Sequence, residues 1–310
     1  MAERDEALFE YLRGAVVYGV IRNLLYPAHV HKGYEVLCML EGELTVYTPM
    51  RTLRARPGHI VFIAENVIHG YVAQRGSRTL MLAYTPKGSE PFVPVLDGRR
   101  HALLHLRPQD QSPMTHELWN ALLHLPRAQQ NLLGVAGYVH FLLTDIAQFA
   151  ETQPPLAPPA FGPFERALLV IGNEVPGEDA IGSIAESVGL SKYYFSRLFG
   201  QRMGMSYNTY TALMRVNAAR RMMVQTRLSM EQIVERCGFG SQRSFNRQFI
   251  RLTGMTPRQY RKENQPTGVF DYECPALRPL LEARAGMRDP GAPEAAAAPA
   301  AAAHRTGAAT

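Results

Sequence analysis

Arginine and lysine side chains are concentrated in the second half of the chain, and their chemistry suits phosphates and base edges. Between Ser191 and Lys262 there are 14 Lys and Arg residues and two Glu residues, whereas the whole 310-residue chain has a net charge of +6. The rest of the chain is therefore acidic. A basic block of this kind is typical of nucleic-acid-binding proteins. Its apolar residues are spaced for a folded core, which favours nucleic acid over a membrane surface.

The basic block contains an internal repeat. Ile184–Leu190 reappears as Ile233–Phe239, and Phe195-x-Arg-x-Phe199 reappears as Phe245-x-Arg-x-Phe249. Each copy predicts a short helix, a glycine turn and a second helix that begins after a serine cap. Between the copies, Ser206–Gln225 predicts a helix of about 30 Å. This is close to the ~34 Å between successive major-groove faces of B-DNA, so one chain can place two recognition helices in adjacent grooves.

These motifs carry a family resemblance. Phe161–Lys262 resembles the double helix-turn-helix domain of AraC/XylS-type transcription regulators, most closely over Ile233–Arg261. Arg and Gln on its recognition helices suit bidentate contacts to guanine and adenine. For each arginine, a solvated surface charge or a structural salt bridge is the alternative. The residues that the resemblance places on DNA are Lys192, Tyr193, Ser196, Arg197, Gln242, Arg243, Ser244 and Arg247, with Lys192, Arg202, Arg251 and Arg258 facing phosphates.

The N-terminal part of the chain has the pattern of an all-β unit. Turn residues at Glu41-Gly42, Pro57-Gly58 and Arg75-Gly76 separate short β-rich runs, and the even spacing favours a barrel or jelly roll. The predicted strand regions are Ala15–Tyr26, Glu35–Leu40, Glu43–Tyr47, His59–Ile63, His69–Ala73 and Thr79–Tyr84.

A histidine motif lies in this β unit. His29-x-His31-x3-Glu35-x6-Gly42 resembles the first motif of the cupin superfamily, which implies that His69 is the usual fourth metal ligand. The second cupin motif is degraded over Ala64–Ala73, and AraC-type regulators commonly carry such a motif in a sensor domain without metal. We therefore expect a small-molecule pocket with no metal and no cofactor. Its candidate residues are His29, His31, Glu35, Glu41, His69 and Tyr71.

Two alternatives to the sensor hypothesis stay open. In the first, the same three histidines and Glu35 hold a divalent metal, and the barrel is a dioxygenase or isomerase fused to a DNA-binding domain. In the second, His29 and His31 only cap strand ends at the mouth of a loop. Which effector the pocket takes is also open, since both a sugar and a small organic acid are compatible with it.

A helical region and a proline-rich spacer divide the chain. Apolar residues recur every seven positions from Leu132 to Ile146 and predict a helix that either packs on its own barrel or forms a dimer interface. Four prolines within Pro154–Ala160 predict a stiff linker. The expected divisions are a cupin-like sensor at 1–112, a helical connection at 113–153, a linker at 154–160, the DNA-binding domain at 161–263 and a largely disordered tail at 264–310.

Several classes of protein are disfavoured by what the sequence lacks. No P-loop, dinucleotide fingerprint, G-x-S-x-G or H-E-x-x-H motif is present, and Cys38, Cys237 and Cys274 are too scattered for a disulfide framework. The first residues are acidic, unlike a secretory signal, so we expect a cytoplasmic location. The sequence predicts a multidomain α+β regulator that is not an enzyme. Its expected partners are double-stranded promoter DNA, a small effector and a second copy of itself. The resemblance to AraC/XylS-type regulators further implies that it activates transcription by contacting RNA polymerase.

Overall fold

The structure, a computed structural model, describes residues 17–31, 33–84, 103–124, 132–153, 161–173, 180–265 and 269–286. Its N-terminal domain has two β-sheets. One contains six strands in the order β10-β1-β8-β3-β6-β9, and the other contains four in the order β2-β7-β4-β5. The strands are β1 (Val17–Arg22), β2 (Leu25–His29), β3 (Tyr34–Glu41), β4 (Leu44–Tyr47), β5 (Thr52–Ala55), β6 (Ile60–Ile63), β7 (His69–Ala73), β8 (Arg78–Tyr84), β9 (Leu103–Leu106) and β10 (Phe270–Asp271).

The turns that punctuate the sheets lie where the sequence predicted them. Gly42, Gly58 and Gly76 have φ values of 79, 81 and 83°, which only glycine adopts without strain. The predicted run Ala15–Tyr26 is interrupted at Asn23 (φ 52°), so it forms two strands that belong to different sheets. The sequence analysis missed β5 and β9. Otherwise, the expected cupin-like β-domain is confirmed.

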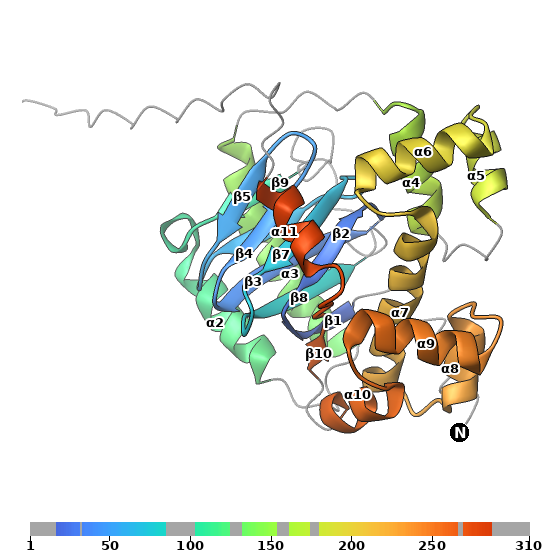
Figure 1. The fold of residues 1–310 in the computed structure, drawn as a ribbon. Helices are drawn as coiled ribbons and strands as arrows, with labels where there is room; N and C mark the ends of the chain where they lie inside the picture. The colour runs from blue at the N-terminus through green and yellow to red at the C-terminus, as the bar shows by residue number, and fades with distance from the viewer. Residues whose placement is uncertain are drawn as a thin grey trace, which may run out of the picture.

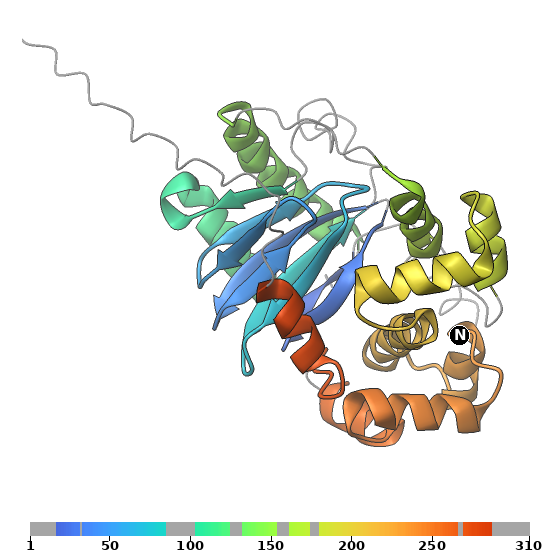
Figure 2. The same ribbon diagram turned by 45° about the horizontal axis from the view of Figure 1, so that its top comes forward.

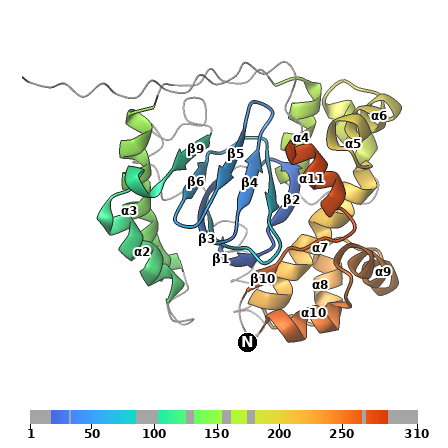
Figure 3. The ribbon, with the colours of Figure 1, turned by 60° about the vertical axis from the view of Figure 1, so that its left-hand side comes forward.

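Two helices cover the outer face of the six-stranded sheet (Figure 3). They are α2 (Pro113–Leu123) and α3 (Leu132–Glu151), and a short 3-10 helix, η2 (Pro108–Asp110), precedes them. Leu142, Leu143 and Ile146 of α3 are buried in one cluster with Trp119 of α2 and residues of the sheet. The described part of the apolar seam, from Leu142 to Ile146, therefore packs on its own barrel, which is one of the two alternatives.

The C-terminal domain is helical. Two helix-turn-helix units, α5–α6 (the first unit) and α8–α9 (the second unit), pack on α7, which connects them (Figure 1). Ser191, Ser206, Ser229 and Ser241 cap the helices that follow them, as predicted. The helices are α4 (Pro163–Asn173), α5 (Ile181–Ser187), α6 (Lys192–Met203), α7 (Tyr207–Gln225), α8 (Met230–Arg236), α9 (Gln242–Thr253) and α10 (Pro257–Asn264).

After α10 the chain returns to the β-domain. Residues 269–286, which we name the C-terminal strap, contain β10 and α11 (Arg278–Gly286). Strand β10 pairs in parallel with β1, and α11 lies against β2, β7 and β4 (Figures 1 and 2). The expectation that 264–310 is largely disordered is wrong over this segment, because its order comes from tertiary contacts and not from a local pattern.

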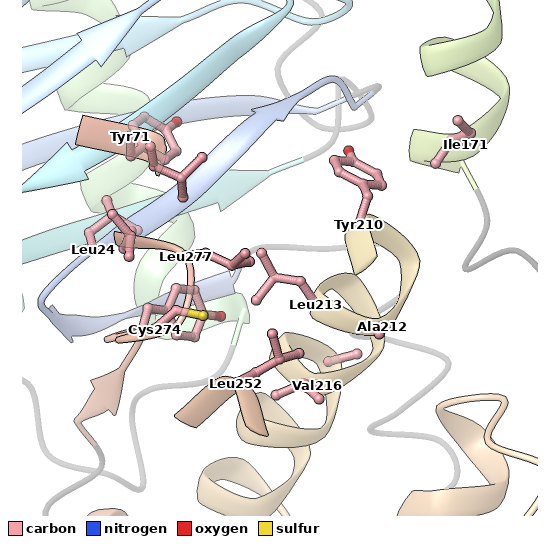
Figure 4. Packing of buried hydrophobic residues seen from close by; sticks show 14 of the residues in the cluster. Leu24, Tyr71, Ile171, Tyr210, Ala212, Leu213, Val216, Leu252, Cys274 and Leu277 are labelled. Carbon is pink, nitrogen blue, oxygen red and sulfur yellow. The ribbon is translucent and has the colours of Figure 1, made fainter. Parts of the chain in front are cut away.

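The strap joins the two domains through a shared apolar core. Figure 4 shows Leu277 of the strap between Leu24 of the β-domain and Leu213 of α7, with Cys274 close by. All four side chains are buried. The two domains are therefore packed together and are not independent bodies on a linker. The predicted linker 154–160 itself and the terminal segments 1–16 and 287–310 lie outside the described residues.

Candidate nucleic-acid interface and sensor-domain site

The first recognition helix, α6, exposes the residues that the sequence analysis assigned to DNA. Phe195 and Phe199 are fully buried and fix the inner face of the helix. The outer face carries Tyr193, which is 80% exposed, and Arg197, whose guanidinium lies 5.6 Å from the ring centre of Tyr194. Lys192 and Ser196 are exposed on the same helix. The structure brings all four predicted side chains of this unit to one accessible surface.

The second recognition helix, α9, repeats this arrangement with different side chains. Phe245 and Phe249 are fully buried, and Arg243 and Arg247 are exposed. Gln242 and Ser244 are partly exposed in the first turn. The sequence analysis missed Asn246, whose side-chain oxygen accepts a hydrogen bond of 3.1 Å from the Gln242 amide. This i,i+4 contact orients the Gln242 side chain, and the Gln-x3-Asn spacing was the signal for it.

Not every basic residue of the block is available to DNA. Arg215 and Arg220 of α7 are 5% and 2% exposed. Arg220 donates to Asn217 at 3.1 Å and to the Glu273 carbonyl at 2.6 Å, and it lies over the ring of Tyr260. These arginines serve the fold through hydrogen bonds and ring contacts. The charge of the block therefore exceeds the charge that faces outward.

Three histidines and a glutamate meet inside the β-domain. His29 ends β2, His31 follows in the loop, Glu35 lies on β3 and His69 begins β7 opposite His29. One ligand atom from each of the four lies within 4.8 Å of all the others. His31 Nε2 is 3.2 Å from Glu35 Oε1, and His69 Nε2 is 3.3 Å from Glu35 Oε2. The arrangement can bind a small cation or the polar groups of a ligand.

Backbone carbonyls fix the orientation of all three imidazole rings. A carbonyl oxygen only accepts, so each contacting Nδ1 carries a hydrogen. Burial lowers the pKa of His31, but its contact with the Glu35 carboxylate outweighs this and raises the pKa above its ordinary value. The contacts join Nδ1 of His29, His31 and His69 to the oxygens of Pro27, Gly33 and Val67 at 3.0, 2.8 and 2.8 Å respectively.

The charges of the cluster are strongly coupled. Burial would raise the pKa of the Glu35 carboxyl, but the His31 and His69 rings hold it well below its usual range. Burial and the neighbouring His69 hold the pKa of His29 well below its ordinary value. Burial and the Glu35 carboxylate raise the pKa of Tyr71 well above its ordinary value. At neutral pH the site therefore contains a carboxylate, a protonated phenol and an uncharged His29.

Tyr71 belongs to this cluster, whereas Glu41 does not. The Tyr71 hydroxyl donates a hydrogen bond to Glu35 Oε2. Glu41 is exposed at the end of β3 and forms an ion pair of 2.7 Å with Arg78. The pairing of β3 with β8 shifts register between Met39 and Glu41, which breaks the alternation that places Glu35 inside. The prediction that Glu41 lines the pocket is corrected accordingly.

A path of aromatic contacts leads from the cluster to α7, and the sequence analysis missed it. The ring of Tyr26 on β2 lies 4.4 Å from that of His29 and 6.1 Å from that of Tyr272 in the strap. Arg221 of α7 donates to the Tyr272 hydroxyl at 3.5 Å and lies close enough to Tyr26 to interact with its phenol. No local motif marks these residues, because they meet only through the packing of the two domains.

Two family models match the chain. One, described as a helix-turn-helix domain, matches residues 184–263, and the other, described as an AraC-like ligand binding domain, matches residues 18–126.

Within the described ranges, none of the helices combines the length and the hydropathy that a bilayer crossing requires.

Known regulators are similar to this chain in sequence, and one solved structure is similar to it in fold. The chain is 37% identical over 86 residues to the HTH-type transcriptional regulator Rv1931c of Mycobacterium tuberculosis, covering 28% of this chain and 33% of that protein. It is 22% identical over 254 residues to the HTH-type transcriptional activator RhaR of Escherichia coli, covering 77% and 88% of the two chains. The fold is similar to apo ToxT from Vibrio cholerae, with a TM-score of 0.52 and 11% identity over 81% of this chain and 98% of that one.

The fold and the matched models define a DNA-binding transcriptional regulator, in which a β-sheet ligand-binding domain is joined to two helix-turn-helix units. The chain belongs to the AraC-type transcriptional regulators. This family is not enzymatic, so the alternative of a metal-dependent cupin enzyme is set aside.

Proposed function

We propose that the protein is a transcription activator that binds promoter DNA in the cytoplasm as a homodimer, contacts RNA polymerase and responds to an effector in its β-domain. Each chain places α6 and α9 in adjacent major grooves. The observation that carries this proposal is the position of both exposed recognition faces on one connecting helix. The 19 residues of α7 span about 28 Å at ~1.5 Å per residue.

Base reading is divided between the two helices. Tyr193, Ser196 and Arg197 contact bases from α6. On α9 the readers are Gln242, Arg243, Ser244 and Arg247, which have the donors for bidentate contacts to purines. Lys192 contacts a phosphate at the start of α6.

The effector site consists of His29, His31, Glu35, His69 and Tyr71. Binding there restrains His29, and Tyr26 transmits this restraint to Arg221 of α7 and to the strap. Since α7 connects both recognition helices, a small shift there changes their relative placement. A coupling of this kind is typically about 1–3 kcal/mol.

The dimer and activator assignments have separate support. Phe141 on α3 is 61% exposed and Met114 on α2 is 58% exposed, although the opposite faces of these helices are buried on the barrel. This outer surface is available to a second copy. The similarity to RhaR, which is named an activator, favours activation over repression. In vitro transcription with RNA polymerase tests the activator assignment. Stimulation of transcription from the promoter by the protein supports an activator, and inhibition identifies a repressor.

A salt titration of DNA binding tests the central proposal. The full chain is titrated onto DNA from its own promoter region and onto a random duplex of equal length, at several salt concentrations. We expect log K to fall steeply with log salt on both duplexes and the promoter to bind more tightly. Equal affinity for the two duplexes would contradict sequence-specific binding, and no binding at low salt would remove DNA as the partner of this domain.

A further inference from the structure

Two amide side chains at the start of α9 are joined by a hydrogen bond. Gln242 and Asn246 lie four residues apart, which makes them neighbours on the surface of the helix. The Gln242 Nε2 atom donates to Asn246 Oδ1 at 3.1 Å. Both residues are half-buried, and Phe245 between them is fully buried. Asn246 therefore holds the Gln242 amide at the margin of the exposed face of the helix.

The scaffold of a helix-turn-helix unit does not require this hydrogen bond. In the internal repeat, Lys192 and Ser196 of α6 occupy the positions of Gln242 and Asn246. Both helices are 12 residues long, begin after a capping serine and end at a glycine in the left-handed conformation. Because α6 forms without an amide pair, the pair belongs to the surface of the second unit and not to the fold of the repeat.

The hydrogen bond changes what the Gln242 amide can offer to a base. A free glutamine amide has two hydrogens on Nε2 and an acceptor at Oε1. Asn246 engages one of these hydrogens, so one donor and one acceptor are left. Turning the Gln242 amide over would bring its Oε1 against Asn246 Oδ1, and two acceptors do not pair. Asn246 thus fixes both the number of free donors and the side on which the oxygen lies.

One donor beside one acceptor is the complement of adenine in the major groove. Adenine presents a donor at N6 and an acceptor at N7, whereas guanine presents two acceptors, N7 and O6. Thymine and cytosine each present only one of the two groups that the held amide can pair with. We propose that Asn246 is a positioning residue for DNA recognition, which holds the Gln242 amide in the orientation that selects adenine over guanine.

This inference rests on the proposed function, in which α9 lies in a major groove, and it adds which base Gln242 selects and which residue enforces the choice. It also predicts a characteristic effect of removing Asn246. The terminal torsion of a glutamine side chain has a broad range of its own, so without Asn246 the amide turns freely. Both Nε2 hydrogens are then available to the two acceptors of guanine. The contact with DNA is kept, but its discrimination is lost.

The test measures base preference in variants of the full chain. Each protein is titrated onto DNA from its own promoter region and onto a panel of singly substituted duplexes. The position that Gln242 reads is the one at which Gln242→Ala loses discrimination. Asn246→Ala removes the acceptor, and Asn246→Asp keeps an acceptor of the same shape. The matched control is Gln248→Ala, which removes a different side-chain hydrogen bond of α9, the one that Gln248 accepts from Arg251 at 2.9 Å.

We expect the unmodified protein and Gln248→Ala to prefer adenine over guanine at that position by about tenfold or more. Asn246→Ala should reduce this preference several-fold. Asn246→Asp should keep it while binding every duplex more weakly, because the added negative charge repels phosphates. Combining Asn246→Ala with Gln242→Ala should cause no loss of discrimination beyond that of Gln242→Ala, since Asn246 acts through Gln242.

Several outcomes would overturn the inference. One is an Asn246→Ala protein that binds all duplexes more weakly but keeps the adenine preference, particularly if urea denaturation shows a lower midpoint, because the role of Asn246 is then structural. Alanine favours helix, so this variant should keep the urea midpoint of the unmodified protein. A preference of the unmodified protein for guanine, or loss of the adenine preference in Asn246→Asp, would mean that Asn246 donates to Gln242 and does not accept from it.

The same titrations separate this inference from the proposed function. Equal affinity of the unmodified protein for promoter and random duplexes would overturn both. If the unmodified protein binds its promoter specifically but Gln242→Ala loses discrimination at no position, the proposed function stands and the role of Asn246 falls. An adenine preference that Asn246→Ala weakens and Asn246→Asp restores supports both.

Discussion

The two helix-turn-helix units share a scaffold but present different surfaces. In both, a pair of phenylalanines four residues apart is buried and an arginine between them is exposed. The first unit adds the exposed Tyr193, whereas the second adds Gln242 and Arg243 in its first turn. Arg and Gln discriminate bases by bidentate hydrogen bonds. The second unit therefore offers more side chains with donors for bidentate base reading than the first, which has Arg197 alone in that role.

The units also differ in how they are held by the strap. The second unit adjoins α10, whose Tyr260 hydroxyl donates to the Asp271 carbonyl at 3.0 Å, and Arg220 of α7 donates to the Glu273 carbonyl. The first unit meets the strap at the end of α11, where Arg284 donates to the Gln201 carbonyl. The buried contacts are on the side of the second unit. The strap therefore contacts the side of the second unit more closely than that of the first.

Breaking the strap gives the largest expected effect. Arg278 is 4% exposed and donates to Glu273, Glu282 and the Ala73 carbonyl of β7. Arg278→Ala leaves these acceptors without their donor and should lower the free energy of unfolding by about 3 kcal/mol. Urea denaturation measures it.

The matched control is Arg75→Ala, whose guanidinium lies 3.9 Å from the same Glu273 but is 71% exposed. An exposed pair of this kind contributes about 0–1 kcal/mol. Equal losses for the two variants would show that the strap does not depend on the buried Arg278.

The strap is also where sequence analysis reached its limit. The repeat was predictable because its elements are local: serine caps, glycines in the left-handed conformation and phenylalanines at i,i+4 are readable within a few residues. The strap has no such pattern, since β10 is only two residues long and is ordered by its pairing with β1. For the same reason the sequence did not show that Arg220 serves the core and not DNA.

The candidate sensor site was predictable in composition but not in extent. The spacing of His29, His31 and Glu35 identified three of its members. The resemblance to the cupin motif added His69, and strand alternation from His69 added Tyr71. Glu41 was misplaced because a register shift in β3 cannot be read from residue types. The packing of Tyr26 against α7 depends on the docking of two domains, for which a single sequence carries no periodic signal.

Removing a base-reading arginine gives the next largest effect. Arg243→Ala should weaken binding to the promoter site by about 1–3 kcal/mol and relax the preference at particular bases, because a bidentate contact is lost. Binding to a panel of singly substituted sites measures both quantities. Equal loss on every sequence, including random DNA, would place Arg243 on a phosphate and remove the contrast between the units.

The two units also differ in how their first helices are capped, and a cap of this kind contributes about 1 kcal/mol to stability. Ser229 and Gln232 form a reciprocal capping box at the start of α8, whereas α5 begins after Ala180, which has no side chain to cap it. Ser229→Ala should lower the free energy of unfolding by about 1 kcal/mol. Ser183→Ala is the control, because that hydroxyl only donates to the Ala180 carbonyl. Its effect should stay within ~0.5 kcal/mol, and an equal loss in both variants would refute the assigned cap.

The smallest effect is expected at the phosphate contact of the first unit. Lys192 is exposed in the first turn of α6, and Lys192→Ala should weaken binding to all sequences alike. The slope of log K against log salt should become shallower by about one, because one fewer counterion is released. Arg56→Ala in the β-domain, where the guanidinium is 70% exposed, should leave the slope unchanged. A base-dependent loss for Lys192→Ala would instead place Lys192 on a base edge and narrow the contrast with the second unit.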